Sequence, residues 1–203
     1  MIEKVHIATS RPIGDKCIKY AKAHMPDGYE FCENIQDSDV LLCVMYDTIL
    51  KEDFISQRRC YNFHGGVLPE YRGVGIFSWA IINEEEETGI TLHELDKGLD
   101  TGPVIACQKF PINKDSTAHS LFEKGMDVVY EMFVEHFCNL VTGQYIAKSV
   151  SKKPNSLYTR KMLDEKRDIT NLLRALTFPG KEGMYYYTSE GDKIFLNEDY
   201  NIL

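Results

Sequence analysis

The sequence predicts an α/β fold with a mainly parallel sheet, helices on both faces, and a small C-terminal helix and β-hairpin. Short apolar runs of strand length alternate with polar segments of helical character through the first part of the chain, which is typical of parallel α/β sheets. Residues 40–46 are apolar throughout, as expected for a central strand buried on both faces. Residues 168–178 favour a short helix, and residues 184–196 favour a hairpin with Gly191 in its turn.

The individual elements follow from local pattern. Helix ends are assigned from capping residues, so a long helix is expected to begin at the cap residue Ser116 and to stop at Gly143. The loop at residues 97–102 holds two glycines and Asp100 and directly follows Asp96, which predicts a tight connection between two paired strands. In chain order we expect strands at 3–9, 29–34, 40–46, 60–64, 88–96 and 102–112, and helices at 15–24, 50–58, 77–87 and 116–143.

Composition narrows the class of function. The 203 residues carry a net charge of −8, which disfavours binding to nucleic acid or to anionic membranes. The six cysteines form no C-x-x-C pair, which indicates a reducing compartment without a disulfide framework. The N-terminus lacks the apolar stretch of a signal peptide, and the longest dense apolar run is too short to span a bilayer. We therefore expect a cytoplasmic protein.

Two segments carry chemistry. Asn62 and His64 lie two residues apart at the end of a predicted strand, so their side chains point the same way, toward the edge where open α/β sheets bind ligands. Asp100 lies in the tight loop, and a carboxylate near His64 would orient its ring and stabilise the imidazolium. An amide, an imidazole and a carboxylate together suit a developing oxyanion and a moving proton.

These segments, "NFHGGVLPEYRG" and "TGITLHELDKGLDTGPVIA", resemble the two signature segments of the folate-dependent formyltransferase family. The resemblance implies a Rossmann-like sheet, a catalytic core over residues 1–147 and a C-terminal extension over residues 148–203. It implies that 10-formyltetrahydrofolate is the co-substrate and that no metal is needed. The catalytic positions of the family fall on Asn62, His64 and Asp100, and the folate pocket falls on Met45, Tyr46, Leu95, Asp96 and Leu99.

One position departs from the family pattern. Gly66 stands where the family usually has serine. Because that serine is not a nucleophile in the family, we expect a change in loop geometry or acceptor binding and not in the reaction.

The favoured interpretation of the acceptor amine is a nucleotide-linked amino sugar, such as a dTDP-4-amino-4,6-dideoxyhexose. We expect the protein to lack the further C-terminal barrel that the tRNA enzyme has, which disfavours tRNA, and the loop "TSRPIGD" lacks the glycine-rich phosphate cradle of the purine enzyme. The tail is similar to the region after the core in nucleotide-sugar and tRNA formyltransferases. The residues expected to contact the acceptor are Arg11, Arg72 and Trp79.

Alternative interpretations stay open at this stage. The acceptor could be glycinamide ribonucleotide or methionyl-tRNA, water could accept the formyl group in a hydrolase, or the domain could bind without catalysis. Histidines other than His64 are interpreted as scaffold or surface residues, His93 among them, and Trp79 has a packing role as its simpler interpretation. The aromatic hairpin is a possible homodimer face.

Overall fold

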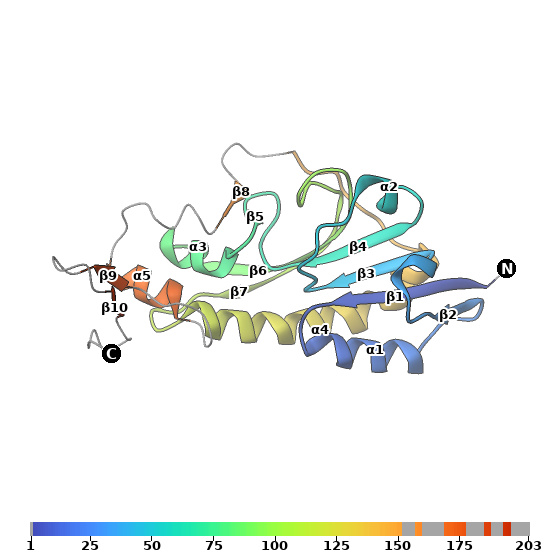
Figure 1. Ribbon diagram of the computed structural model, residues 1–203, viewed down its shortest axis with the longest axis horizontal. Helices are drawn as coiled ribbons and strands as arrows, with labels where there is room; N and C mark the ends of the chain where they lie inside the picture. The colour runs from blue at the N-terminus through green and yellow to red at the C-terminus, as the bar shows by residue number, and fades with distance from the viewer. Residues whose placement is uncertain (1, 152–156, 160–168, 178–184, 188–192, 196–203) are drawn as a thin grey trace.

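The computed structural model describes residues 2–151, 157–159, 169–177, 185–187 and 193–195 (Figure 1). Its centre is a six-stranded sheet in the order β2-β1-β3-β4-β6-β7. Four strands run parallel to one another, and the last two form an antiparallel hairpin on the edge of β4. The predicted α/β class with a mainly parallel sheet is confirmed. The strands are β1 (Glu3–Thr9), β2 (Tyr29–Phe31), β3 (Val40–Val44), β4 (Arg59–His64), β6 (Glu87–Glu94) and β7 (Val104–Pro111).

Helices cover both faces of this sheet, as predicted. α1 (Ile13–Ala23) and α4 (Ala118–Thr142) lie side by side on one face, and the short α2 (Glu52–Ile55) lies on the other (Figure 1). α3 (Ile76–Ile82) packs against α4 beyond the carboxyl end of β4.

The start of α4 differs from the prediction by one residue. The N-cap is Thr117 and not Ser116, because the Thr117 side chain accepts the backbone N–H of Ser120 while the Ser120 hydroxyl accepts that of Thr117. This reciprocal pair satisfies two donors that a helix end otherwise leaves unpaired. The predicted stop at Gly143 is confirmed, with φ of 72° in the left-handed region.

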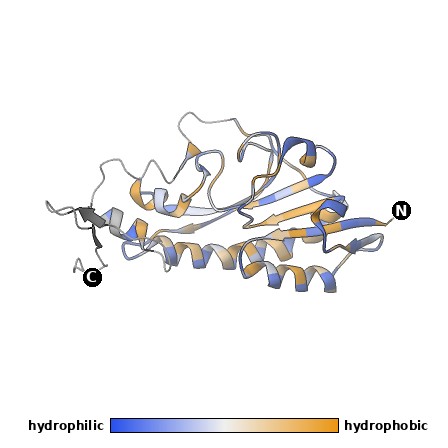
Figure 2. Cartoon of the chain, in the orientation of Figure 1, coloured by the Kyte–Doolittle hydropathy of each residue, from blue (hydrophilic) through white to orange (hydrophobic). Residues whose placement is uncertain are grey.

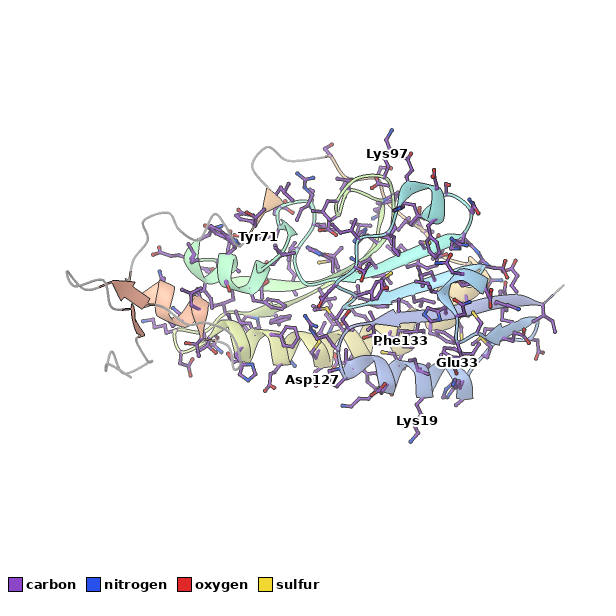
Figure 3. All side chains as sticks on the ribbon, in the orientation of Figure 1. Lys19, Glu33, Tyr71, Lys97, Asp127 and Phe133 are labelled. Atoms are coloured by element: carbon purple, nitrogen blue, oxygen red, sulfur yellow. The ribbon has the colours of Figure 1, made fainter. Side chains whose placement is uncertain are left out.

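The pleat of β4 divides its side chains between two environments. Tyr61 and Phe63 point into the main core under α4, whereas Cys60 joins a smaller cluster under α2. Every residue of β3 is buried, and Figure 2 shows this strand as hydrophobic along its length, while α1 and α4 alternate. Polar side chains such as Lys19 point away from the sheet (Figure 3). Since alternate residues share a face, Asn62 and His64 must lie on the α2 side.

The C-terminal region contacts the core through α3. α5 (Ile169–Leu176) accepts a 2.6 Å hydrogen bond from the Ser78 hydroxyl at the carbonyl of Ala175. β5 (Arg72–Gly73) runs parallel to β8 (Leu157–Tyr158), which ties the loop after β4 to the same region.

The predicted hairpin is also present. β9 (Tyr185–Tyr187) pairs antiparallel with β10 (Lys193–Phe195), while the turn with Gly191 lies outside the described residues. The division of the chain at residues 147 and 148 stays a prediction. No helix among the described residues combines the length and the apolar character needed to cross a bilayer.

Candidate active site

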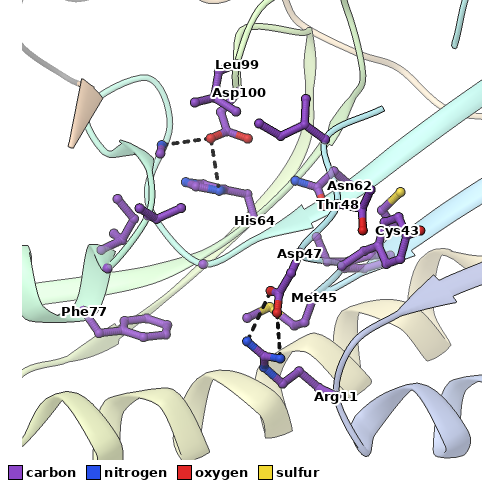
Figure 4. Close-up of a pocket in the computed structure, with 18 of the residues that line it drawn as sticks. Arg11, Cys43, Met45, Asp47, Thr48, Asn62, His64, Phe77, Leu99 and Asp100 are labelled. Atoms are coloured by element: carbon purple, nitrogen blue, oxygen red, sulfur yellow. Dashed lines mark hydrogen bonds and ion pairs between the residues drawn. The ribbon is translucent and has the colours of Figure 1, made fainter. Parts of the chain in front are cut away.

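A cleft of about 540 Å³ opens at the carboxyl ends of β3 and β4 (Figure 4). Asn62 and His64 project into it from β4, as their two-residue spacing predicts. His64 is 6% exposed, so only the cleft side of its ring is open to a ligand. Cys43 also lines the cleft, but burial raises the pKa of its thiol, which leaves it an unreactive neutral group.

Asp100 reaches the same cleft from the loop between β6 and β7. Its Oδ2 lies 3.6 Å from Nδ1 of His64 and accepts the backbone N–H of Gly73 at 2.9 Å. The carboxylate is 7% exposed, and its backbone has φ of 51°. Positive φ is uncommon outside glycine but is tolerated by aspartate and asparagine. The loop therefore delivers the third predicted residue to the two on β4.

Both ring nitrogens of His64 face oxygen acceptors. Nε2 lies 2.7 Å from the carbonyl oxygen of Tyr71, so it carries a proton and donates to that carbonyl. Nδ1 faces the carboxylate of Asp100. The distance of 3.6 Å is longer than a hydrogen bond, so the carboxylate acts on the ring through its charge. To donate to a bound oxyanion, His64 must exchange its bond to Tyr71.

Gly66 makes that bond to Tyr71 possible. A Cβ at this position would lie 2.9 Å from Nε2 of His64 and 2.8 Å from the carbonyl oxygen of Tyr71. Those distances are too short for a carbon atom, so a serine here would displace either the ring or the loop. The expected change in loop geometry at Gly66 thus has a physical cause, namely the packing of His64 over the glycine.

His93 lies next to two of the predicted site residues, although it does not line the cleft itself. It lies opposite Asn62 in the β4–β6 register and is 1% exposed. Its Nε2 lies 3.3 Å from Nδ2 of Asn62 and 3.7 Å from Oδ1 of Asp100. Burial, and then the neighbouring His64, lower the pKa of His93 to about 4, so its ring is neutral near pH 7. The burial of His93 agrees with its interpretation as a scaffold residue, while its contact with Asn62 is a feature that the sequence did not indicate.

The residues expected to bind folate all line the cleft. Met45 and Tyr46 follow β3 on one side, and Leu95, Asp96 and Leu99 follow β6 on the other. Asp96 shapes its own loop, because its Oδ1 accepts the Gly98 N–H at 2.9 Å and the Thr101 hydroxyl at 2.6 Å. The two segments form opposing walls with Asn62 between them.

The three residues expected to contact an acceptor differ in their placement. Arg11 lines the cleft, but its guanidinium pairs with both carboxylate oxygens of Asp47, at 2.8 and 3.2 Å (Figure 4). Arg72 lies at the margin, with Nη1 3.5 Å from the carbonyl oxygen of Leu99. Trp79 is 1% exposed and donates its indole N–H to the carbonyl of Thr159. Trp79 is absent from the cleft lining, so its role is packing and the acceptor-contact hypothesis does not fit its position.

The part of the cleft that is formed by the helices has a largely apolar lining. These lining residues come from α3, the start of α4 and the end of α5, and they include Ile76, Phe77, Ala118, Phe122, Ala175 and Leu176. Among the described residues, no group of three or more His, Cys, Asp and Glu side chains is placed to hold a metal ion.

Comparison with known families gives one match in this region. The family model described as formyl transferase matches residues 22–137, more than half of the chain. This span includes the end of β3, all of β4, and the β6–β7 loop, so every residue of the Asn62–His64–Asp100 group lies within it.

In sequence, the chain is similar to curated methionyl-tRNA formyltransferases. The enzyme from Clostridium tetani is 33% identical over 181 residues, which cover 83% of this chain and 57% of that protein. The chain spans less than two thirds of the length of the curated relatives it matches.

Solved structures with this fold include sugar N-formyltransferases and a methionyl-tRNA formyltransferase. The latter, from Clostridium thermocellum, superposes with a TM-score of 0.73 over 99% of this chain and 96% of that chain, at 16% identity. A sugar N-formyltransferase from Shewanella sp. FDAARGOS_354 superposes with a TM-score of 0.84 over 97% of both chains, at 18% identity. An N-formyltransferase from Helicobacter canadensis, solved with folinic acid and dTDP-3-aminofucose, gives 0.70 over 100% of this chain and 98% of that chain, at 18% identity. At such identities the superpositions establish the shared fold.

Proposed function

Because the chain belongs to the formyl transferase family, we propose that it moves a formyl group from 10-formyltetrahydrofolate to the amine of a nucleotide-linked amino sugar. The observation that carries the proposal is the meeting of Asn62, His64 and Asp100 in one cleft. The strand and the loop that supply these residues are separated in the sequence, and the family match covers all three residues.

The walls of the cleft support the folate part of the proposal. The pterin would lie between the segment after β3 and the loop after β6, where backbone groups and apolar side chains are available to a flat heterocycle. Folinic acid in the Helicobacter canadensis neighbour gives a precedent for a folate on this fold. In our proposal, the formyl carbon lies next to Asn62.

The proposed reaction forms one C–N bond and breaks another. The free amine attacks the formyl carbon, and the carbonyl oxygen becomes negative in a tetrahedral intermediate. Asn62 donates an N–H to this oxygen, and the His64 imidazolium stabilises it, with its charge held by Asp100. The intermediate then releases N10 of the folate, while the proton lost by the amine passes to N10 through His64, Asp100 or water.

Each polar group contributes a measurable part of the rate. Removal of one donor to such an oxyanion typically lowers kcat by about 100- to 1,000-fold. Holding both substrates in one cleft supplies much of the remaining acceleration. Replacement of Asn62, His64 or Asp100 by alanine is therefore expected to abolish transfer in a folded protein.

The sugar acceptor is favoured by the closeness of the structural likeness. The TM-score is 0.84 for the Shewanella sugar enzyme and 0.73 for the Clostridium thermocellum methionyl-tRNA enzyme, although both superpose over nearly the whole of this chain. A transferred product would be an N-formylated sugar nucleotide, a class of precursor for surface polysaccharides. Methionyl-tRNA is the second candidate, and the 33% identity with the Clostridium tetani enzyme favours it.

A panel of acceptors tests the proposal. The protein is incubated with 10-formyltetrahydrofolate and, separately, with dTDP- and UDP-linked amino sugars, methionyl-tRNA, glycinamide ribonucleotide, or no amine. Turnover on an amino-sugar nucleotide alone is the expected result. Turnover on methionyl-tRNA or glycinamide ribonucleotide alone would replace the acceptor, and formate release without any amine would identify a hydrolase.

A further inference from the structure

The hydrogen bonds of His93 define which of its ring nitrogens carries the proton. Its Nδ1 lies 2.7 Å from the carbonyl oxygen of Glu94, and a carbonyl only accepts, so Nδ1 carries the ring proton. The pKa of His93, lowered to about 4 by burial, leaves the second nitrogen without a proton near pH 7. Nε2 is therefore a fixed hydrogen-bond acceptor in a nearly dry position, since the residue is 1% exposed.

The group facing that acceptor is the Asn62 carboxamide. Asn62 and His93 are direct partners in the antiparallel β4–β6 register, and Nδ2 of Asn62 lies 3.3 Å from Nε2 of His93. If the carboxamide rotated by about 180° around its Cβ–Cγ bond, its oxygen would face the lone pair of Nε2. Two hydrogen-bond acceptors would then repel each other. The histidine thus selects the orientation in which the amide nitrogen faces it.

An amide nitrogen has two hydrogens, and His93 uses one of them. The other stays available in the cleft that Asn62 lines. A carboxamide free to turn would present its oxygen to the cleft part of the time, and an oxygen repels a developing oxyanion. Orientation of this amide therefore decides whether Asn62 stabilises or opposes the charge.

We infer that His93 is a positioning residue for formyl transfer, which holds the Asn62 carboxamide with an N–H directed at the formyl oxygen. His93 does not line the cleft, so it acts through Asn62, whereas Oδ1 of Asp100 lies 3.7 Å from Nε2, beyond hydrogen-bond distance. The inference rests on the proposed function for its catalytic part, whereas the contact between the two side chains is independent of any activity.

Two substitutions at His93 separate positioning from packing. His93→Leu removes the acceptor nitrogen and fills its space with an apolar side chain of similar size. His93→Gln instead provides an oxygen that can accept a hydrogen bond from Asn62. We expect His93→Leu to lower kcat by roughly 10- to 100-fold, less than loss of the donor itself, with KM for the folate within about threefold of wild type. His93→Gln should recover most of kcat.

His6→Leu is the matched control. His6 is also a strand histidine whose Nδ1 lies 3.0 Å from a backbone carbonyl, that of Cys32, but it lies on β1, which β3 separates from β4 and Asn62. Its kcat should equal that of wild type. Wild-type kcat in His93→Leu, or equal losses in His93→Leu and His93→Gln, would overturn the inference.

Nuclear magnetic resonance supplies a readout that does not need turnover. The ¹⁵N shifts of His93 should report a protonated Nδ1 and an unprotonated Nε2 at pH 7. The side-chain amide resonances of Asn62, identified by their loss in Asn62→Asp, should shift in His93→Leu and return toward their original positions in His93→Gln. A protonated Nε2 would overturn the inference even in an active enzyme. Absence of formyl transfer by the wild-type protein would overturn the proposed function, while these resonances would still decide the contact.

Discussion

Asp100→Asn is the substitution that probes the electrostatics of the site with least disturbance of its shape. Asparagine has the same size as aspartate and tolerates the positive φ of 51° found at this position. Its side-chain oxygen can still accept the Gly73 N–H, which Asp100 accepts at 2.9 Å. The charge is lost and the loop keeps its conformation.

The size of the effect follows from the distance between Asp100 and His64. Opposite unit charges 3.6 Å apart attract by about 4.6 kcal/mol at an effective dielectric constant of about 20. An amide dipole keeps part of that attraction. Because about 1.4 kcal/mol corresponds to a factor of ten in rate, we expect kcat to fall by about 100- to 1,000-fold.

The assay is steady-state conversion of 10-formyltetrahydrofolate to tetrahydrofolate in the presence of the acceptor found in the panel. KM for the folate should stay within about threefold of wild type, because the charge matters chiefly in the transition state. Thermal unfolding should confirm that the variant is folded. A folded Asp100→Asn enzyme with kcat within about fivefold of wild type would refute the proposed role of the carboxylate.

Three further predictions concern neighbouring groups. The folded-state pKa of His93, about 4, lies below its ordinary value of about 6.5, so the unfolded chain binds the extra proton between these pH values. The free energy of unfolding should therefore fall by up to about 1.4 kcal/mol per pH unit as pH falls from 6.5 toward 4. His93→Gln should flatten this slope in denaturant titrations, and an unchanged slope would contradict the assignment. Gly73→Ala should lower kcat by about 10- to 100-fold, because at φ of 97° an added Cβ meets the Tyr158 carbonyl and moves the N–H that binds Asp100. Normal kcat in this variant would contradict that reasoning. Trp79→Ala should cost about 3 to 5 kcal/mol of stability, measured by denaturation, with kcat retained below the melting temperature, whereas lost kcat in the folded variant would restore a role at the site.

The local sequence pattern was sufficient to predict that Asn62 and His64 lie on the same face of β4. A period of two places Asn62 and His64 on one face whatever the rest of the chain does, and a short apolar strand beside a glycine-rich loop indicates which end of the sheet carries the ligand. The hairpin after α3 and the stop of α4 at Gly143 also depend on local chemistry, which is why the structure confirms both.

The position of His93 depends on strand order, which no local pattern contains. The sequence shows only that the side chains of His93 and Glu94 point to opposite faces of a strand. It does not show which strand lies next to that one. Only the antiparallel placement of β6 beside β4 puts the His93 ring next to Asn62. The same limit applies to Trp79, because its packing interpretation did not include the contact with the carbonyl of Thr159. The available signal for His93 was its two-residue spacing from Thr91, since the structure pairs Thr91 with His64 and His93 with Asn62.

The most direct test of the central claim is a crystal structure of the protein with a stable 10-formyl folate analogue. We expect the pterin between the backbone at residues 45–46 and the loop at residues 95–99. The formyl oxygen should lie about 3 Å from Nδ2 of Asn62, on the same side as His64. A folate bound outside this cleft, or a formyl group turned away from Asn62, would contradict this claim.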